Sequence, residues 1–335
     1  MADTLRVGLI GCGSVSGDHL RAWARCASAK VVALCDPAPG RAAARAAEFA
    51  ILGVHATPEA MIAKERLDLL DIASPRGLHA EHLKLAARHG LHALCEKPLC
   101  PTHAEAVGLL DALDGGIRVM VNENWRFRPY YARIGEWIRQ GRLGRITQYR
   151  AALVRSSLIP DAQGVANVLV RMPFIATEPR LMTAEWLIHQ LDVARSLIGE
   201  MRLVAARMAR ASSQVVGEDS VAMLLEGEAG LPVTVQGVMS AAGHDIRGPD
   251  RVEITGTRAS VVFDGGVLRL LGPEPETVAF DEDDARQAGF DASIAHFVAR
   301  LRDGAAFWTS ARDQIATLKL VEDAYTSAGV PRALP

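Results

Sequence analysis

The sequence has few aromatic residues, little net charge and no long hydrophobic run, and the last two of these exclude classes of protein. Phe, Trp and Tyr make up 5% of the 335 residues, and Lys and Arg nearly balance Asp and Glu to leave a net charge of −2. A balanced charge provides no excess of positive charge that would attract nucleic acid or an anionic membrane, so we expect neither partner. No apolar run reaches the ~18 residues that a bilayer crossing needs. The first residues also lack the basic stretch of a secretory signal.

Cysteine is scarce too. The five cysteines all lie in the first third of the chain, their number is odd, and no two form a C-x-x-C pair. This pattern indicates reduced thiols in a cytoplasmic protein rather than a disulfide framework or a structural zinc site.

Several catalytic motifs are missing from the chain. It has no Tyr-x-x-x-Lys, which is the acid of short-chain dehydrogenases, no Gly-Lys-Ser/Thr of a phosphate-cleaving P-loop, and no Gly-x-Ser-x-Gly elbow. These absences exclude three common uses of an α/β fold.

The first ~120 residues alternate between short apolar strands and helices. We expect strands near residues 6–10, 31–35, 69–73, 92–96 and 117–122, with helices between them. Buried strands separated by helices predict a parallel sheet covered on both faces. A chain of this length is expected to form two domains, and we place them at residues 1–123 and 124–335.

The pattern changes in the second half. A helix is expected over residues 129–140, a strand over 145–154, an irregular stretch over 155–180 and a helix over 181–197. Strand-like runs with short turns follow between residues 202 and 271 and predict an antiparallel α+β domain, closed by two helices. One face of such an open sheet needs a cover, so we expect a homodimer or homotetramer formed through it.

A glycine turn follows the first strand, and an acid ends the second. Backbone N–H groups of such a turn can approach a pyrophosphate at a helix N-terminus. Asp36 lies 20 residues past Ser16, where its carboxylate can accept hydrogen bonds from ribose hydroxyls. A plain glycine turn is the alternative. The expected dinucleotide contacts here are Gly11, Gly13, Ser14, Val15, Ser16 and Asp36.

Two further segments end strands of the same sheet. Ser74 and Pro75 follow the third expected strand, with His79 in the next helix, and Glu96 and Lys97 follow the fourth. Strand carboxyl ends line the ligand crevice of such sheets, so we expect all five to contact the nucleotide. The Lys97 ammonium could also stabilise an alkoxide during hydride transfer. The alternatives are a surface turn and a salt-bridged lysine at the rim.

Glu185, His189 and Asp192 are spaced to share one face of a helix. A histidine between two carboxylates is suited to general acid–base catalysis near neutral pH, so we predict that these residues are catalytic. A surface ion cluster is the alternative. Glu and His at this spacing could also ligate zinc, but no third ligand stands at a recognisable distance, and we predict no metal.

Residues 122–131 mix aromatic, arginine and asparagine side chains at the expected domain junction. Rings stack on sugar faces and amides bind hydroxyls, which suits a small polyhydroxylated ligand; interdomain packing is the alternative. Arg171, in the irregular stretch, could bind a carboxylate or a hydroxyl. The predicted substrate contacts are Asn124, Trp125, Arg128, Tyr130 and Arg171.

Together these motifs resemble the glucose–fructose oxidoreductase, inositol dehydrogenase and MocA family (Gfo/Idh/MocA). The matching features run from the glycine turn and Asp36 through Glu96-Lys97-Pro98 to His189-x-x-Asp192. The resemblance implies an N-terminal Rossmann domain and a C-terminal α+β domain with a large open, mostly antiparallel sheet. It also implies a catalytic lysine and histidine, which would be Lys97 and His189. Many members have aspartate where this chain has Glu185.

The resemblance further implies NAD(P)-dependent hydride transfer to or from a hydroxyl carbon of a sugar, polyol, cyclitol or sugar acid. We expect NAD because Asp36 would repel a 2′-phosphate, with NADP as the alternative because Arg41 is near in sequence. Two other functions stay open. One is an enzyme that retains its nucleotide and cycles hydride internally, and the other is a cofactor-binding regulator without catalysis.

Overall fold

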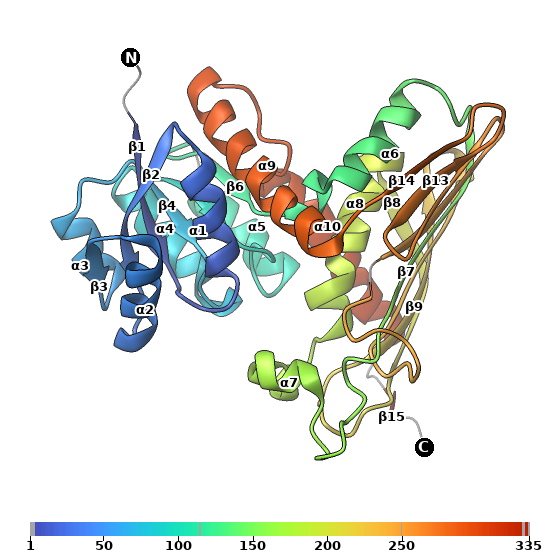
Figure 1. Ribbon diagram of the computed structural model, residues 1–335, viewed down its shortest axis with the longest axis horizontal. Coiled ribbons are helices and arrows are strands. Elements are labelled where there is room, and N and C mark those ends of the chain that lie inside the picture. The colour runs from blue at the N-terminus through green and yellow to red at the C-terminus, as the bar shows by residue number, and fades with distance from the viewer. Residues whose placement is uncertain (1–3, 114, 249, 330–331, 334–335) are drawn as a thin grey trace. The chain divides into compact units, whose positions relative to one another are not determined.

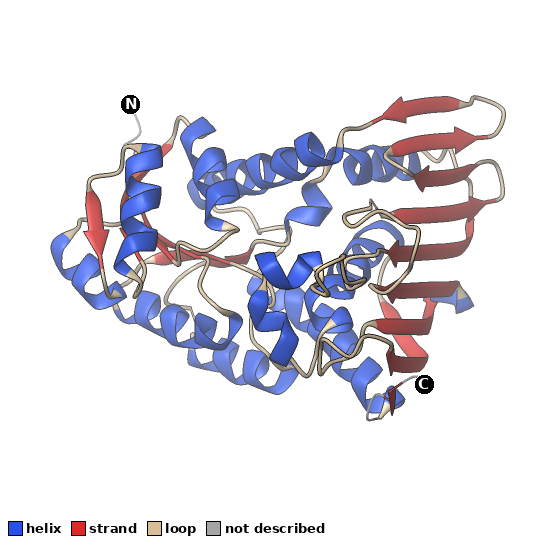
Figure 2. Ribbon diagram, turned by 60° about the horizontal axis from the view of Figure 1, so that its bottom comes forward, coloured by secondary structure: helices blue, strands red, loops and turns tan. Residues whose placement is uncertain are grey.

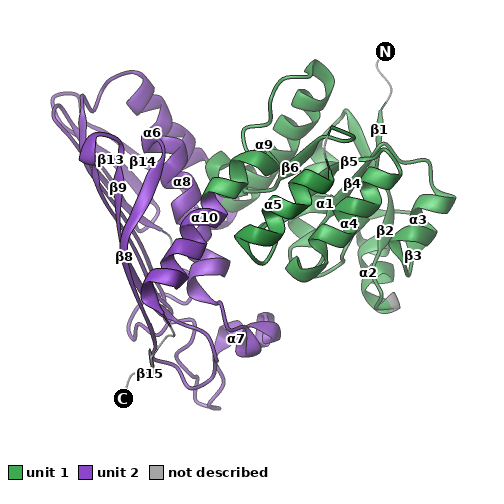
Figure 3. Ribbon diagram, turned by 180° about the vertical axis from the view of Figure 1, so that it is seen from behind, with its two compact units in different colours: residues 1–128, 286–316 green, residues 129–285, 317–335 purple. Residues whose placement is uncertain are grey.

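The computed structural model describes residues 4–113, 115–248, 250–329 and 332–333 (Figure 1). The chain forms two compact units (Figure 3). Unit 1 comprises Met1–Arg128 and Arg286–Ala316, and unit 2 comprises Pro129–Ala285 and Thr317–Pro335. These units differ from the expected domains mainly at residues 286–316, which lie within the expected second domain and belong to unit 1.

Unit 1 is built on a six-stranded parallel sheet with the order β3-β2-β1-β4-β5-β6. This is the strand order of the dinucleotide-binding doubly wound fold. The strands are β1 (Leu5–Ile10), β2 (Ala29–Cys35), β3 (Gly53–His55), β4 (Leu69–Ile72), β5 (His92–Cys95) and β6 (Val119–Val121). The sequence predicted all of them except β3, which has only three residues and no hydrophobic run.

Helices connect these strands, as the alternating pattern predicted (Figure 2). They are α1 (Ser16–Arg25), α2 (Pro39–Phe49), α3 (Pro58–Lys64), α4 (His79–Arg88) and α5 (His103–Ala112). The side chains of Thr57 and Thr102 each accept a backbone N–H where α3 and α5 begin, as N-cap residues do. The short helical turns η1 (Arg76–Leu78) and η2 (Asn124–Phe127) follow β4 and β6.

Helix α9 (Glu282–Asp303) completes the core of unit 1 from far along the chain. Phe290, Ile294 and Phe297 are buried in the same hydrophobic cluster as Trp23 of α1 and strand residues of the parallel sheet. The rings of Trp23 and Phe297 meet edge to face, with centroids 6.5 Å apart. This long-range packing could not be predicted from the sequence, because the apolar face of a helix does not indicate which sheet it will cover.

Unit 2 is built on a nine-stranded sheet with the order β14-β13-β12-β11-β7-β10-β9-β8-β15. Neighbours are antiparallel except for β7 with β10 and β8 with β15, so the predicted mostly antiparallel sheet is confirmed. The strands are β7 (Ile146–Val154), β8 (Met201–Arg210), β9 (Ser220–Gly227), β10 (Pro232–Val238), β11 (Arg251–Gly256), β12 (Ser260–Asp264), β13 (Val267–Leu271), β14 (Glu276–Ala279) and β15 (Arg332–Ala333).

Helices α6 (Pro129–Arg139) and α8 (Ile188–Ile198) lie on one face of this sheet, as does most of α10 (Ala311–Ala328) (Figure 1). Side chains along the strands alternate between buried and exposed, as a sheet with one covered face requires. Within the described ranges, no helix covers the other face. The predicted irregular stretch over residues 155–180 contains a short helix, α7 (Asn167–Arg171), and the turn η3 (Pro173–Thr177).

The helix expected over residues 181–197 is not uniform, which corrects the sequence analysis. Its first part, η4 (Thr183–Leu187), is a π-helical turn, and regular α-helix begins at Ile188. A π turn contains more residues per revolution than an α-helix, so the spacing from Glu185 to His189 is not that of a regular α-helix. That Glu185, His189 and Asp192 share one face of the helix stays a prediction.

Candidate active site

The glycine turn after β1 has the backbone that close approach to a ligand requires. Gly11 has φ +97°, and a Cβ there would lie 2.5 Å from the carbonyl oxygen of Ala73. Gly13 has no neighbour within 4 Å of a Cβ, so the space beside it is open. Ser16 stands in the place of a third glycine, and its hydroxyl donates to Gly13 O at 2.7 Å. The small side chain therefore stabilises the turn from inside.

Asp36 is fixed at the end of β2 by two backbone N–H groups. Its Oδ2 accepts from the N–H of Cys12 at 2.8 Å, and its Oδ1 accepts from the N–H of Ala38 at 2.8 Å. A carboxylate has about four acceptor sites, so two further hydrogen bonds remain open to hydroxyl donors. No side chain caps the N-terminus of α1, which leaves the positive end of the helix beside the turn.

The turn after β4 is held by two histidines of α4. Ser74 Oγ lies 2.9 Å from Nδ1 of His82. Both ring nitrogens of the buried His79 face backbone carbonyl oxygens, Nδ1 at 2.8 Å from Pro98 O and Nε2 at 2.9 Å from Ser74 O. Burial lowers the pKa of His79, and the two carbonyl contacts oppose this. His79 thus ties the Ser74-Pro75 turn to the segment that carries Lys97.

The residues after β5 have two different environments. Glu96 is buried and accepts hydrogen bonds from His19 Nε2 at 2.9 Å and Asn122 Nδ2 at 2.8 Å. Burial opposes ionisation of Glu96, but its hydrogen bond from His19 and the nearby charges lower its pKa overall. Lys97 is partly exposed and is followed by a cis peptide bond to Pro98. Glu96 thus belongs to a buried network, while Lys97 reaches the surface of unit 1.

The sequence analysis did not assign a role to the residue at the centre of this network, His19. Its Nδ1 donates to Asp71 Oδ2 at 2.8 Å and its Nε2 donates to Glu96, so both ring nitrogens carry protons. Burial alone would lower the pKa of His19, but the two carboxylates raise it to about 10. Trp23 Nε1 also donates to Asp71, at 2.6 Å. Neither Asp71 nor its pairing with His19 carries a local sequence signal, because the two residues are 52 positions apart.

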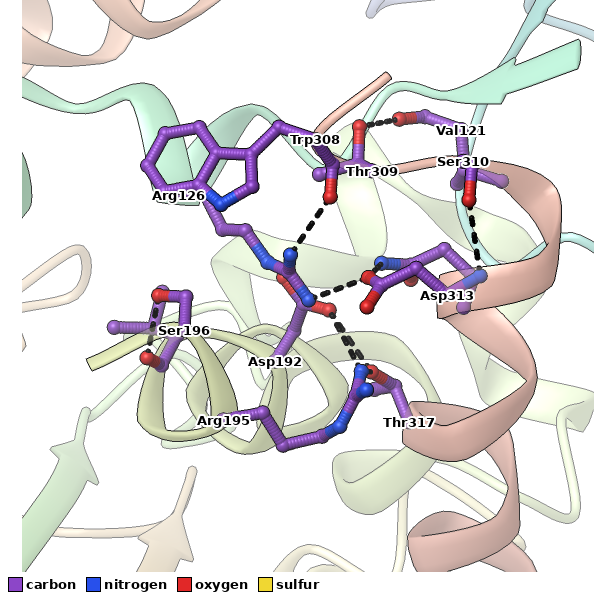
Figure 4. A network of polar contacts seen from close by, with 12 residues as sticks. Val121, Arg126, Asp192, Arg195, Ser196, Trp308, Thr309, Ser310, Asp313 and Thr317 are labelled. Carbon is purple, nitrogen blue, oxygen red and sulfur yellow. Dashed lines mark hydrogen bonds and ion pairs between the residues drawn. The ribbon is translucent and has the colours of Figure 1, made fainter. Parts of the chain in front are cut away.

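The segment after β6 is buried along its whole length. Glu123 is fully buried, and burial raises its pKa to about 8 although the charges of Lys97 and Arg126 oppose the shift. Arg126 donates to Trp308 O at 3.0 Å and pairs with Asp313 Oδ2 at 2.7 Å (Figure 4). Arg126 therefore fastens the turn η2 to the start of α10.

The predicted substrate residues of unit 1 are also close to one another. The guanidinium of Arg128 lies over the ring of Trp125, with its Cζ 4.1 Å from the ring centroid. A Cβ at Gly289 of α9 would lie 2.9 Å from Asn124 O, so the helix backbone packs tightly against this turn. Asn124, Trp125 and Arg128 are at most 6% exposed. Trp125 and Arg128 form one stacked pair, an arrangement typical of cation–π contacts.

In unit 2, the π turn is held by a buried carboxylate that the sequence analysis did not select. Glu218 is fully buried and accepts from the N–H groups of Leu181 at 3.1 Å and Thr183 at 2.9 Å, and from the hydroxyl of Tyr325 at 2.6 Å. It therefore satisfies two backbone donors where the helix begins. π-helical turns such as Thr183–Leu187 occur often at functional sites.

The three predicted catalytic residues of unit 2 are all nearly buried. Glu185 is 8%, His189 6% and Asp192 0% exposed. Asp192 accepts a hydrogen bond from Thr317 at 2.8 Å and lies 3.9 Å from the guanidinium of Arg195 (Figure 4). These contacts join α8 to α10 and give Asp192 a structural role in unit 2.

The remaining two predicted substrate residues differ in exposure. Tyr130 is fully buried, and its ring stacks on Phe263 with centroids 4.3 Å apart, which places it in the packing of unit 2. Arg171 is exposed at the end of α7. The sequence alone does not show that Tyr130 is buried and Arg171 exposed, since the burial of a side chain depends on which part of the sheet packs against it.

The described part of the chain contains neither a cluster suited to a metal ion nor a helix suited to cross a bilayer. Among these residues, no group of three or more His, Cys, Asp or Glu side chains is arranged to hold a metal ion. In the same ranges, no helix combines the length and the apolar character of a bilayer-spanning segment. All five cysteines are free thiols.

Family models match both halves of the chain. Residues 5–122 match the model described as "Oxidoreductase family, NAD-binding Rossmann fold", and residues 131–262 match the GFO/IDH/MocA C-terminal domain. The chain is 32% identical to a D-apiose dehydrogenase of Paraburkholderia graminis, over 96% of this chain and 86% of the relative. It is 31% identical to inositol 2-dehydrogenase 2 of Saccharopolyspora erythraea, over 77% and 73%.

A solved structure is similar throughout. An oxidoreductase from Agrobacterium radiobacter, crystallised with NAD⁺, L-tartaric acid and magnesium, superposes with a TM-score of 0.90 at 26% identity, covering 97% of this chain and 96% of that one. The protein therefore belongs to the Gfo/Idh/MocA oxidoreductase family, as the motifs predicted. It is an oxidoreductase with an NAD-binding Rossmann domain.

The residues of unit 1 fit that nucleotide. The open space beside Gly13 leaves room for a pyrophosphate at the start of α1, and Gly11 lets the turn pack against the backbone of Ala73. The two remaining acceptor sites of Asp36 match the two hydroxyls of a ribose.

Proposed function

We propose that the protein is an NAD-dependent dehydrogenase that oxidises a secondary or hemiacetal hydroxyl of a sugar, polyol, cyclitol or sugar acid. The relatives named above, D-apiose and inositol dehydrogenases, support this substrate class. One observation carries the proposal: this chain contains the glycine turn, Asp36, Lys97 and His189 together. NAD, when bound, supplies the hydride acceptor.

We propose Lys97 and His189 as the groups that act on the reacting hydroxyl. The Lys97 ammonium donates a hydrogen bond to the hydroxyl oxygen and stabilises the negative charge that develops there. The imidazole of His189 accepts the hydroxyl proton as general base. Glu185, four residues earlier in the sequence, orients His189 or contacts the substrate.

For the nucleotide, we propose contacts from the glycine turn, from Asp36 and from the strand ends at Ser74 and Pro75. Asp36 favours NAD over NADP, because its carboxylate would repel a 2′-phosphate. We further propose that Asn124, Trp125 and Arg128 bind hydroxyls and one face of the substrate ring. Arg171 is a candidate for a carboxylate or a further hydroxyl.

Two properties of the whole molecule belong to the same proposal. We propose that the protein works in the cytoplasm, which suits its five free thiols. We also propose a homodimer or homotetramer formed through the open face of the nine-stranded sheet. Apolar side chains on this face, among them Leu224 at 45% exposure, support that assembly.

The function is tested by NADH formation at 340 nm with a panel of aldoses, apiose, cyclitols and sugar acids. We expect activity with at least one member, and His189→Ala should lower kcat roughly 10²–10⁴-fold with little change in the dissociation constant for NAD. An unchanged kcat would remove His189 from the mechanism. Nucleotide retained through purification without net NADH formation would instead favour an enzyme that cycles hydride internally.

A further inference from the structure

The first turn of α1 carries a carboxylate close to the helix end at the glycine turn. α1 begins at Ser16, and Asp18 is the third residue of the helix. The side chain of Asp18 is only 8% exposed, so little water screens its charge. The N-cap residue, Val15, has an apolar side chain, and the helix dipole makes this end of α1 positive. A carboxylate here lowers the positive potential that a bound pyrophosphate would meet.

Two arginines hold this carboxylate, one from α1 itself and one from far along the chain. Arg21 pairs with Asp18 Oδ1, and Arg286 of α9 pairs with Asp18 Oδ2. Gln287 donates to Asp18 O at 3.1 Å and accepts a hydrogen bond from Arg21 Nε at 2.8 Å. Arg286 and Gln287 therefore fix α9 to the first turn of α1, and each oxygen of the carboxylate faces a guanidinium.

The charges around this turn leave a small positive excess. A third guanidinium, that of Arg45 in α2, lies against Gly17, because a Cβ on that glycine would be 3.3 Å from Nη2 of Arg45. Arg45 is paired with Glu48 at 2.6 Å. Three arginines thus face two carboxylates. Loss of Arg286 would cancel this excess and leave Asp18 with one cation instead of two.

We propose that Arg286 is a positioning residue for the nucleotide, which keeps the pyrophosphate end of α1 positive by balancing the charge of Asp18. The arginine acts through the carboxylate and does not itself have to reach a phosphate. Without it, the part of the Asp18 charge that Arg21 does not balance opposes a bound pyrophosphate. The inference rests on the proposed place of the pyrophosphate at the start of α1. It makes nucleotide affinity depend on α9, which no nucleotide-binding motif of the sequence includes.

The test compares ligands that differ in phosphate charge and needs no turnover. Isothermal titration calorimetry gives the dissociation constants of NAD, ADP-ribose and adenosine for the unmodified protein and for Arg286→Gln. Because the effect is electrostatic, NAD and ADP-ribose should each bind roughly 3–10-fold more weakly to the variant. Adenosine has no phosphate and should bind equally well to both proteins. A loss of affinity that adenosine shares in full would show a general distortion of the site and would overturn the inference.

Substitution of Asp18 separates charge balance from direct contact. The double variant Asp18→Asn/Arg286→Gln lacks both charges, so its affinity for NAD should return to that of the unmodified protein. Asp18→Asn alone leaves two arginines without their carboxylate and should bind NAD more tightly by a similar factor, which keeps the inference testable if Arg286→Gln folds poorly. An unchanged affinity in Asp18→Asn, or a double variant as weak as Arg286→Gln, would contradict the proposed role.

Arg25→Gln is the matched control, because it breaks another ion pair between α1 and α9. Arg25 pairs with Asp291 at 2.5 Å, but it lies in the last turn of α1, far from the glycine turn. The three dissociation constants should therefore equal those of the unmodified protein. If Arg25→Gln weakened NAD as much as Arg286→Gln does, packing between the helices would explain both results and the charge argument would be wrong.

A further variant tests the place of the nucleotide by itself. Gly13→Asp puts a carboxylate into the open space beside the turn and should abolish NAD binding. Normal binding by Gly13→Asp would remove the proposed nucleotide site and the inference with it. If Gly13→Asp fails to bind NAD while Arg286→Gln binds it normally, only the role of Arg286 is refuted.

Discussion

His19 joins three elements of unit 1 through one protonated ring. It comes from α1, while its partners Asp71 and Glu96 come from β4 and from the end of β5. The local motif around it predicted the glycine turn, since that turn depends on residues close in sequence. It could not predict the carboxylate pairing, because Asp71 is 52 residues away and is buried within a strand.

The raised pKa of His19 makes unit 1 depend on pH in a defined direction. A group whose pKa rises on folding, here from about 6.5 to about 10, stabilises the fold fully below the lower value and ceases to do so above the higher one. The difference in unfolding free energy between the unmodified protein and His19→Gln should therefore shrink between pH 7 and pH 10, by about 1.4 kcal/mol per pH unit. Urea unfolding of both proteins at several pH values measures this difference in unfolding free energy.

His89→Gln provides the comparison, because His89 is exposed at the end of α4. Its effect on unfolding should be small and nearly constant over the same range. A constant difference for His19→Gln as well would mean that the ring is not a buried cation.

At the level of elements, the helix that carries His189 begins with a π turn rather than with a regular α-helical turn. The sequence predicted a helix over this segment correctly, since its apolar residues recur with helical spacing. The sequence did not reveal the extra residue in this turn. The turn depends on Glu218, which lies shortly before β9 and accepts hydrogen bonds from the N–H groups of Leu181 and Thr183.

Removal of the Glu218 charge should loosen the start of this helix. In Glu218→Gln, one amide N–H₂ would face backbone N–H donors, and the unfolding free energy should fall by about 2–3 kcal/mol. Hydrogen exchange at the amides of Leu181 and Thr183 should accelerate. Glu226→Gln breaks only a surface pair with Arg202 and should cost less than about 1 kcal/mol. Equal exchange rates in both variants would show that Glu218 does not hold the turn.

At the scale of the whole molecule, the nine-stranded sheet leaves one face without a described helix. The strand-like runs with short turns predicted an open antiparallel sheet, and one face of such a sheet was expected to need a cover. A shallow hollow on it is lined by small and apolar side chains, among them Ala205, Ala222 and Leu224. Self-association would bury this surface.

A charge at the middle of this face should therefore weaken assembly. Leu224→Lys is expected to shift the protein toward monomer in sedimentation velocity at micromolar concentration, because two copies would bring like charges together in an apolar contact. Leu52→Lys, which changes a leucine that is 97% exposed in unit 1, should leave the sedimentation coefficient unchanged. An unmodified protein that sediments only as monomer would refute the assembly itself.

The return of α9 to unit 1 limits how this protein can be recombined with its relatives. A chimera made by exchanging residues 1–128 alone would bring a foreign parallel sheet against the native Phe290, Ile294, Phe297 and Phe307, which form part of its core. The core of the nucleotide-binding unit is thus completed by a distant segment of the same chain. A successful graft of the nucleotide half has to carry residues 286–316 with it.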